Sequence, residues 1–358
     1  MEQHEQQPPR NPPPMPPYAS PPPAPPAPKK NNRGLFALFG LAGALLLCAL
    51  LSLGFFFVAL AAGGSGGGLA SAAPRWEEQV IAGSGSERIV VIEVSGAIGV
   101  ETPDFGGRQL TTEQYIQQIQ QAATDTRVRA VVLRINSPGG GVVASNEIHA
   151  ALMKFRETGK PLIASMGTVA ASGGYYIATA AEQIYANPDT FTGSLGVIIS
   201  LLNYEETLEK IGLQQLVFKS GDLKDIGSPA RPLSDEERDV LQAIVDQAYA
   251  GFVDVIVAGR NLPRDRVLEL ADGRIYTGMQ AQQLGLVDEL GNRDDAIAEA
   301  KTRAGLPDDA LVVRYNSTPS LLSLLQGSLI QMQQPPDPLG LRQLTQPQTP
   351  LLEYRMVP

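Results

Sequence analysis

Two glycine-rich turns contain the residues whose types and spacing most readily suggest chemistry. The stretch INSPGGGVV at 135–143 follows an apolar run and presents three consecutive glycines before a helix-like segment. Such a turn exposes backbone N–H groups that suit an anion or a developing oxyanion. A tight strand-to-helix turn without any ligand would have the same composition, so this motif alone leaves both interpretations open.

The second turn surrounds one serine with small residues. Ser172 lies in SMGTVAASGGYYIATAA at 165–181 and is followed directly by Gly173 and Gly174. Each glycine costs backbone entropy, so the run favours close approach of another backbone over core packing. The stretch is not the G-x-S-x-G elbow of hydrolases, and alone Ser172 would be a helix cap. Together with the SPGGG turn it becomes a candidate nucleophile, with N–H groups of Gly140 and Gly173 directed at one carbonyl oxygen.

A serine hydroxyl needs a base at neutral pH, and the chain offers few. His149 is the only histidine of the domain, and a half-buried position on a helix is its simpler interpretation. Lys219 and Lys224 lie in FKSGDLKDIGSPARP, a polar connection of the kind that often carries function. A lysine base must lose its proton, so its pKa has to fall from about 10.4 by burial, and Asp222 and Asp225 must point away. The residues alone leave lysine, histidine and a carboxylate open.

Alternating apolar runs and amphipathic segments predict the elements that position these turns. Strands are expected at 88–96, 128–135, 161–166, 183–186, 195–200 and 214–218; helices are expected at 111–123, 142–155, 173–181, 234–259 (with Ser234 as cap), 277–284 and 293–304. This βαβα order predicts an α/β domain with parallel strands. Because ligands bind at the carboxyl ends of strands in open α/β sheets, both turns should meet at one edge.

The ends of the chain predict a membrane anchor. Residues 1–33 contain thirteen prolines and predict an extended cytoplasmic tail. Residues 34–62 are uncharged and exceed the roughly 20 residues of a spanning helix, and the basic cluster before them predicts an exported body. A cleaved signal peptide is the alternative. Residues 63–86 are expected to be a flexible linker, 87–316 the folded domain and 317–358 a tail rich in Gln, Pro and Leu.

Charge and metal-ligand chemistry exclude two classes of function. The formal net charge is -9, and no basic stripe is present that could neutralise nucleic-acid phosphates. One cysteine, Cys48, and two histidines leave no plausible zinc cluster. We therefore expect no nucleic-acid partner, no metal and no cofactor.

Three motifs in order resemble one known family. INSPGGGVVASNEIHAAL, SMGTVAASGGYYIATAAEQIYANPDTFTGSLGVI and FKSGDLKDIGSPARPLSDEER are similar to signal peptide peptidase A (protease IV) in its short, single-domain bacterial form. ADGRIYTGMQAQQLGLVDELG resembles the closing segment of the same family. The resemblance covers roughly 88–315 and excludes the proline-rich tail. It implies a ClpP/crotonase-like fold preceded by a single transmembrane helix.

The resemblance also implies roles for individual residues. Ser172 would be the nucleophile and Lys224 the general base of a Ser–Lys dyad, while Ser194 in TGSLGV would orient the lysine amine. The oxyanion donors would be Gly173 and the SPGG turn, with Gly140 preferred and Gly139 as the alternative. The family further implies a homo-oligomeric ring in which neighbouring subunits could supply serine and lysine.

Together these features predict a membrane-anchored serine endopeptidase that degrades cleaved signal peptides and similar apolar peptides. One alternative is an acyl-CoA hydratase-like enzyme on the same fold, using the glycine turns for a thioester oxyanion. A second is a non-catalytic membrane scaffold whose proline-rich tail recruits cytoplasmic partners.

Overall fold

The computed structural model describes residues 46–48, 50, 52, 76–99, 110–316 and 352–355. The chain divides into two compact units, Met1–Ala72 and Ala73–Pro358. In the first unit, the described residues are helical and belong to the predicted membrane segment. The rest of that segment, and the whole predicted tail at 1–33, lie outside the described residues.

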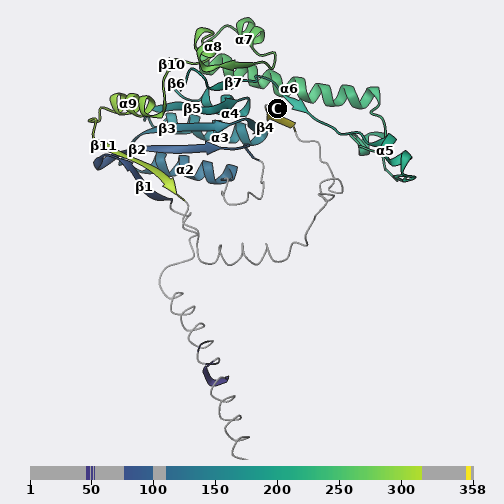
Figure 1. Cartoon of the computed structure of the whole chain (residues 1–358), viewed down its shortest axis with the longest axis horizontal. Helices are drawn as coiled ribbons and strands as arrows, with labels where there is room; N and C mark the ends of the chain where they lie inside the picture. The colour runs from purple at the N-terminus through teal and green to yellow at the C-terminus, as the bar shows by residue number, and fades with distance from the viewer. Residues whose placement is uncertain are drawn as a thin grey trace, which may run out of the picture. The chain divides into compact units, whose positions relative to one another are not determined.

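The second unit is built on a mixed sheet with the strand order β1-β11-β2-β3-β5-β6-β10, and β7 pairs with β5 and with β9 (Figure 1). The bounds are β1 Glu77–Ala82, β2 Ser84–Ser95, β3 Val128–Ser137, β5 Leu162–Ala171, β6 Gln183–Ala186, β7 Phe191–Gly193, β9 Ile275–Thr277, β10 Glu289–Leu290 and β11 Ala310–Asn316. The pairs from β11 through β2, β3, β5 and β6 to β10 are parallel, whereas β1 with β11 and β7 with β9 are antiparallel.

Helices cover both faces of this sheet. Their bounds are α2 Thr112–Thr124, α3 Val142–Arg156, α4 Gly173–Ala178, α5 Glu205–Lys210, α6 Asp235–Arg260, α7 Arg264–Leu270, α8 Gly278–Gln283 and α9 Arg293–Ala304, with a 3₁₀ turn η1 at Asp222–Asp225. In β2, Val90 and Ile92 pack into the larger core cluster with residues of α2 and α3, whereas Ile89 and Val91 pack against α9. Because both faces are buried, the strands are continuous apolar runs and not alternating ones.

Most predicted elements are confirmed, including the cap of the long helix. The Ser234 hydroxyl accepts a hydrogen bond from the Glu237 amide at 3.2 Å, and the Glu237 carboxylate accepts one from the Ser234 amide at 2.9 Å. The predicted strand at 214–218 is wrong. Its apolar side chains are exposed, and no strand of the described chain pairs with it. Instead of one strand at 195–200, the structure has β7, slightly earlier in the chain, and the two-residue strand β8, Ile198–Ile199.

Strands also occur in two ranges predicted to be unstructured. β1 and the first residues of β2 fall within the expected linker at 63–86. β12, Leu352–Arg355, falls within the expected tail at 317–358 and lies between β4, Gly139–Gly141, and β8 in a second sheet of three strands. The second sheet places the C-terminal segment beside the first glycine turn (Figure 1).

Among the described residues, α6 is the helix whose length and composition would allow it to cross a bilayer. Its second half packs into the core through Phe252, Val253 and Ile256. In its first half, Val240 and Ile244 are exposed. The second half of this 26-residue helix therefore stabilises the domain, whereas its first half extends beyond the core.

We predict that Phe155→Ala lowers the free energy of unfolding by about 3–5 kcal/mol, because Phe155 of α3 is fully buried in the larger core cluster and its removal leaves a cavity. Met153→Ala on the same helix is the matched control, since that side chain is exposed, and it should change stability by less than about 0.5 kcal/mol. Denaturant unfolding measures both. Equal losses in the two variants would contradict the packing of α3 described above.

Candidate active site

The two glycine turns meet at one edge of the sheet, as predicted. β3 and β5 run in parallel with Ser137 opposite Ala170, so the SPGGG turn and Ser172 leave adjacent strand ends. The two turns touch closely enough that a side chain at Gly173 has no room. A Cβ there would stand 2.6 Å from the Ser145 hydroxyl oxygen and 3.2 Å from the Gly140 amide nitrogen.

Ser172 has a backbone conformation that its residue type rarely adopts. Its φ is 54° and its ψ is -115°, whereas non-glycine residues seldom have positive φ. The strain is held by hydrogen bonds on both sides: the Ser172 amide donates to the Gly193 carbonyl, and the Ser172 carbonyl accepts from the Tyr176 amide, each at 2.8 Å. The hydroxyl is fully buried and has no hydrogen-bond partner in the described part of the chain. Strained residues of this kind concentrate at functional sites.

The Gly140 amide faces β12, the strand that pairs with the first glycine turn. The Gly139 carbonyl accepts from the Ile98 amide and the Gly141 amide donates to the Ile98 carbonyl, both at 2.8 Å. Since backbone groups alternate in direction along a strand, the Gly140 N–H points the other way, toward β12. Tyr354 is its partner there in an antiparallel pair. The turn therefore presents a donor to an extended peptide.

Ser194 lies next to the predicted nucleophile. β7 pairs with β5 so that Gly193 is opposite Ala171, which places Ser194 and Ser172 one step beyond the paired residues. Ser194 also has positive φ, 51°, and its amide donates to the Arg274 carbonyl at 2.7 Å. It lines a cavity of about 430 Å³ together with residues of α6 and Arg355 of β12. The structure thus brings together Ser172, Ser194 and the glycines, which is the part of the predicted site contributed by the sheet edge.

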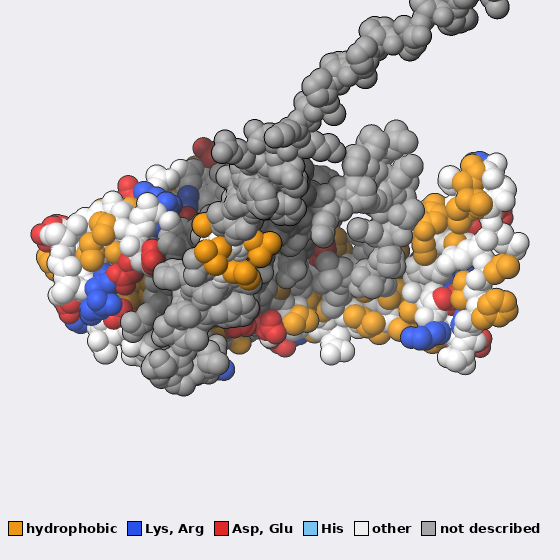
Figure 2. Space-filling view, turned by 90° about the horizontal axis from the view of Figure 1, so that it is seen from below, with side chains coloured by type: hydrophobic (Ala, Val, Ile, Leu, Met, Phe, Trp, Pro, Cys, Tyr) orange, Lys and Arg blue, Asp and Glu red, His pale blue; other side chains and the backbone are white. Residues whose placement is uncertain are grey.

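Lys224 is not part of this cluster in the single chain. It is exposed in η1, on a segment that we call the arm, residues 199–233, which includes α5. Orange side chains gather at the right-hand end in Figure 2. The large apolar side chains that the arm exposes are Leu201, Leu202, Ile211, Leu213, Leu216, Val217 and Phe218. Phe218 is 96% exposed. A surface of this kind is typical of protein–protein contacts.

The arm is tied to α6 by an ion-pair network that also controls the carboxylate beside Lys224. Asp225 accepts a hydrogen bond from Lys219 at 2.8 Å and two from Arg231 at 2.8 and 3.0 Å. Arg231 also donates to the Glu237 carboxylate in the first turn of α6, at 2.8 Å for its Nη1. The Asp225 carboxylate is therefore engaged by Lys219 and Arg231 and not by Lys224, which is one of the two conditions set above for a lysine base.

Hydrogen bonds within this network shift two carboxyl groups. Arg231, and then Lys219, hold the pKa of Asp225 well below its ordinary value. Arg231, assisted by the Ser234 amide, lowers the pKa of Glu237 to about 2. Both groups are charged at neutral pH, so the network is complete under the conditions in which a peptidase would act.

His149 does not take a catalytic position. It is half-buried on α3 and lies edge-on to Tyr176, with ring centroids 5.2 Å apart. Burial, with a contribution from Arg156, lowers the pKa of His149 to about 4. The Ser172 hydroxyl has no hydrogen bond to it. A histidine triad is therefore not formed.

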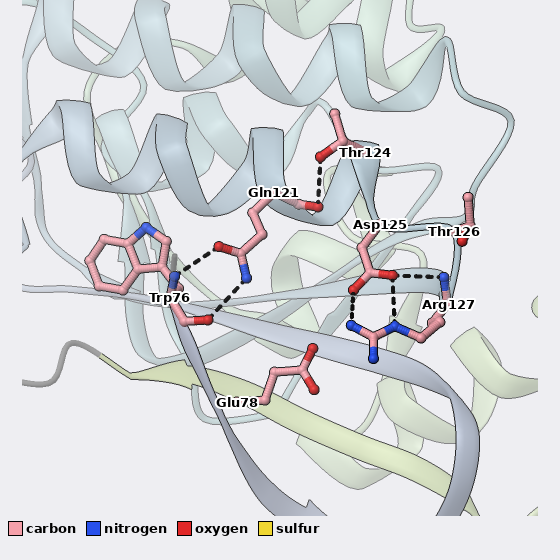
Figure 3. A pocket seen from close by; sticks show the side chains of 7 residues that line it. All are labelled: Trp76, Glu78, Gln121, Thr124, Asp125, Thr126 and Arg127. Atoms are coloured by element: carbon pink, nitrogen blue, oxygen red, sulfur yellow. Dashed lines mark hydrogen bonds and ion pairs between the residues drawn. The ribbon is translucent and has the colours of Figure 1, made fainter. Parts of the chain in front are cut away.

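A cavity of about 530 Å³ at the opposite edge of the sheet is structural in character (Figure 3). The Gln121 side chain clamps the Trp76 backbone, accepting from its amide at 2.8 Å and donating to its carbonyl at 3.0 Å. Asp125 bonds Arg127, which lowers the pKa of Asp125 to about 2. These residues precede β3, whereas Ser172 and the glycines follow β3 and β5. This cavity thus belongs to the amino ends of the strands, away from the proposed chemistry.

Comparison with known proteins places these features in a family. The model of peptidase family S49 matches residues 154–307, and that of Clp protease matches residues 107–190. A putative signal peptide peptidase SppA of Enterococcus faecium is 40% identical over 71% of this chain and 74% of its own length. A putative protease of Synechocystis is 43% identical over 72% of this chain and 90% of its own. The chain belongs to the signal peptide peptidase A family.

Membership gives the fold and the class of chemistry. The α/β fold is Clp protease-like, as expected, and the protein is a serine peptidase; the sheet is mixed, whereas parallel strands were expected. The predicted enzyme class is confirmed, and the hydratase-like and scaffold alternatives are not needed. The peptidase is also 39% identical to Protease 4 of Salmonella typhi, but spans 38% of that protein's length.

Sequence reasoning missed several residues that shape this site. Tyr354 lies beside Gly140, Ser145 contacts the space next to Gly173, and Arg231 fixes the loop of Lys224. The only sequence signal for the first was LLEYR, a short apolar stretch near the end of a polar tail. Nothing in the local pattern distinguished Ser145 or Arg231, because their partners are distant side chains and backbone groups.

We predict that Gly173→Ala reduces kcat about 100-fold, because the added methyl group would press on Ser145 and displace the Gly140 amide from an oxyanion position. Gly251→Ala on α6 is the matched control, since a Cβ there meets nothing within 4 Å and alanine favours helix. Peptidase assays and thermal unfolding of both variants provide the measurement. Full activity of Gly173→Ala would show that the two turns do not cooperate.

The ion-pair network predicts a pH dependence of stability. Because the folded-state pKa values of Asp225 and Glu237 lie below their unfolded values near 4, their contribution is present above about pH 4 and lost as the pH falls toward 2. Arg231→Gln should remove most of this dependence, while lowering stability at pH 7. Thermal unfolding from pH 7 to pH 2.5 tests it. An identical acid slope in the wild type and the variant would refute the assignment.

Proposed function

We propose that this peptidase is membrane-anchored, uses a Ser172–Lys224 dyad, and degrades cleaved signal peptides and similar apolar peptides. One observation carries the proposal. The Ser172 hydroxyl is buried, has no hydrogen-bond partner among the described residues and is held at positive φ. It stands where the Gly140 and Gly173 turns converge, beside a groove in which an extended peptide is already paired with the backbone.

The groove explains why peptides are the substrate class. β12 is antiparallel to both β4 and β8, so a peptide between them gains main-chain hydrogen bonds on two sides whatever its sequence. Side chains alternate out of such a strand, and only pockets in the walls discriminate among them. This mode of binding suits an enzyme that must accept many different apolar segments.

In the proposed reaction, the neutral amine of Lys224 takes the proton of Ser172 as its hydroxyl oxygen attacks the peptide carbonyl carbon. The amides of Gly140 and Gly173, with Gly139 as the alternative to Gly140, stabilise the tetrahedral oxyanion, each donor contributing about 2.7–4 kcal/mol. The protonated amine then gives its proton to the leaving nitrogen, and water hydrolyses the acyl-enzyme. Ser194, next to Ser172, accepts or donates a hydrogen bond that orients the amine.

For Lys224 to reach Ser172, we propose that copies of the chain assemble into a ring and that the arm of one copy packs on the next. The exposed apolar side chains of the arm support this contact, since no other described residue of the chain covers them. Burial in the interface would remove water from the amine and favour its neutral form. Assembly would then complete a site that each chain holds in two parts.

The anchor would place this site near its substrates. Residues 34–62 would span the cell membrane once, with residues 1–33 in the cytoplasm and the catalytic domain outside. Cleaved signal peptides are apolar and remain at the membrane, so a tethered groove meets them at high local concentration.

We predict that Ser172→Ala and Lys224→Met each abolish hydrolysis of an apolar peptide, with thermal unfolding near that of the wild type. Lys210→Met is the matched control, because Lys210 is an exposed lysine of the same arm whose carboxylate partner lies 3.8 Å away, and it should retain full activity. Wild-type activity should rise with pH as the amine loses its proton. A rate that is flat from pH 6 to pH 10, or an active Lys224→Met, would reject the dyad.

Mixing the two inactive variants tests where the lysine comes from. If neighbouring copies supply serine and lysine, co-expressed Ser172→Ala and Lys224→Met chains should recover about a quarter of wild-type activity, since random neighbours then form intact sites. Separately purified variants remain inactive. Absence of recovery in a confirmed mixed oligomer would show that both residues come from one chain.

A further inference from the structure

The short turn η1, which carries Lys224, is held at both of its ends by cationic side chains. At its start, the Lys219 ammonium donates a hydrogen bond to the Asp222 carbonyl at 2.7 Å. At its end, the same ammonium donates to the Asp225 carboxylate at 2.8 Å, and the Arg231 guanidinium donates to the Asp225 carbonyl at 3.2 Å. A 3₁₀ turn of four residues has few backbone hydrogen bonds of its own, so these side chains fix where its backbone lies.

Arg231 connects this turn to the long helix α6. Its Nη1 donates at 2.8 Å to the carboxylate of Glu237, which is buried in the first turn of the helix. The Lys219 ammonium, in contrast, bonds only to Asp222 and Asp225 among the described residues. The two cations therefore have separable effects, because Arg231 joins η1 to the domain whereas Lys219 acts within the arm.

Both oxygens of the Asp225 carboxylate are engaged by these cations. Its Oδ1 accepts from the Lys219 ammonium and from the Arg231 Nη2, each at 2.8 Å, and its Oδ2 accepts from the Arg231 Nε at 3.0 Å. Asp225 directly follows Lys224 in the chain, so a free carboxylate there would be within reach of the amine. Such a pair would favour the protonated amine, and a protonated amine cannot accept the proton of a serine hydroxyl.

The other charged groups of η1 and of the first turn of α6 are carboxylates. Glu237 is engaged by Arg231, whereas Asp235 and Glu236 are exposed. The Asp222 side chain is also exposed, so water and salt screen its charge. These exposed carboxylates are the same in every variant below, and their effect on the lysine amine cancels when the variants are compared.

We propose that Lys219 and Arg231 are positioning residues for the peptidase reaction: they hold η1 in one conformation and keep the Asp225 carboxylate from pairing with the Lys224 amine. The inference rests on the proposed function, because it takes Lys224 as the base. It gives a chemical purpose to a network that would otherwise only stabilise the arm. Lys219 is the better residue to test, since its removal leaves the link from Arg231 to α6 in place.

The first experiment measures the pH dependence of peptide hydrolysis by the full chain in detergent. In Lys219→Met, Asp225 loses one donor and is drawn to Lys224, so the midpoint of the rise in rate with pH should increase by about one pH unit. The rate at pH 7 should then fall about tenfold, while the rate at the alkaline plateau stays near that of the wild type. Lys210→Met is the matched control, because this exposed lysine of the arm has its carboxylate partner 3.8 Å away on α5, and its profile should equal that of the wild type.

Adding Asp225→Asn to Lys219→Met distinguishes positioning from stability. Asparagine keeps the shape and still accepts from Arg231, but it has no charge to pair with the amine, so the double variant should return to within about 0.3 pH unit of the wild-type midpoint. If Lys219 only stabilised the fold, its removal would reduce the rate equally at every pH and Asp225→Asn would add to the loss. An unchanged midpoint in Lys219→Met, or a raised midpoint that Asp225→Asn does not restore, would overturn the proposal.

The second experiment separates this inference from the proposed function, because it needs no catalysis. Ser172→Ala chains with and without Lys219→Met are treated with acetic anhydride over a range of pH, and the initial rate of acetylation at Lys224 is measured by peptide mass spectrometry. Only the neutral amine reacts, so the midpoint of this rate should rise by about one pH unit in Lys219→Met and return with Asp225→Asn, while that of Lys210 stays constant. Equal profiles at Lys224 would overturn the inference even if the dyad is correct. A shifted profile together with an active Lys224→Met enzyme would instead refute the dyad alone.

Discussion

The parallel pairing of β3 with β5 is the constraint on which the site depends. It carries two chemically different turns to one edge, so that amides from the first and a hydroxyl from the second meet there. The register shifts between Ile135 and Ser137, where Gly167 admits the Asn136 side chain at a distance that a Cβ would make tight. The strain at Ser172 is then a local cost, offset by the hydrogen bonds of the strands and helix on either side.

The same pairing explains which parts of the molecule could be predicted from the sequence. Continuous apolar runs and capped helices are local signals, and the core strands, α2, α3, α6 and α9 follow from them. The approach of Gly140 to Gly173 could also be expected, because carboxyl ends of parallel strands share an edge. The remaining features arise from contacts that are distant in sequence. The strand expected at 214–218 has the right composition, but no described strand lies beside it and its apolar side chains are exposed.

The proposed site has two parts: the sheet edge, which is rigid, and the arm, which is separable from it. The sheet edge contributes Ser172, Ser194 and the glycines, all fixed by backbone hydrogen bonds. The arm carries Lys224, the proposed base, and is attached to α6 through side chains, with Arg231 joining Asp225 to Glu237. The local sequence predicts that Lys224 lies in a polar loop. It does not show that Arg231 forms hydrogen bonds with the Asp225 carboxylate beside that lysine. That property depends on how the arm folds back on α6.

The position of α6 in the domain has a consequence for the membrane topology of the chain. By length and composition alone the helix could cross a bilayer, which would put the residues before Asp235 and those after Arg260 on opposite sides of it. The sheet excludes that topology, because β6 and β7 before the helix pair with β10 and β9 after it. Arg260 donates to both carboxylate oxygens of Asp288 at 2.6 and 3.0 Å, and Ser234 caps the other end within the same domain. The strands before and after α6 therefore lie on the same side of any membrane, and α6 is part of the folded domain. The exposed apolar side chains of its first half are available to contact another protein.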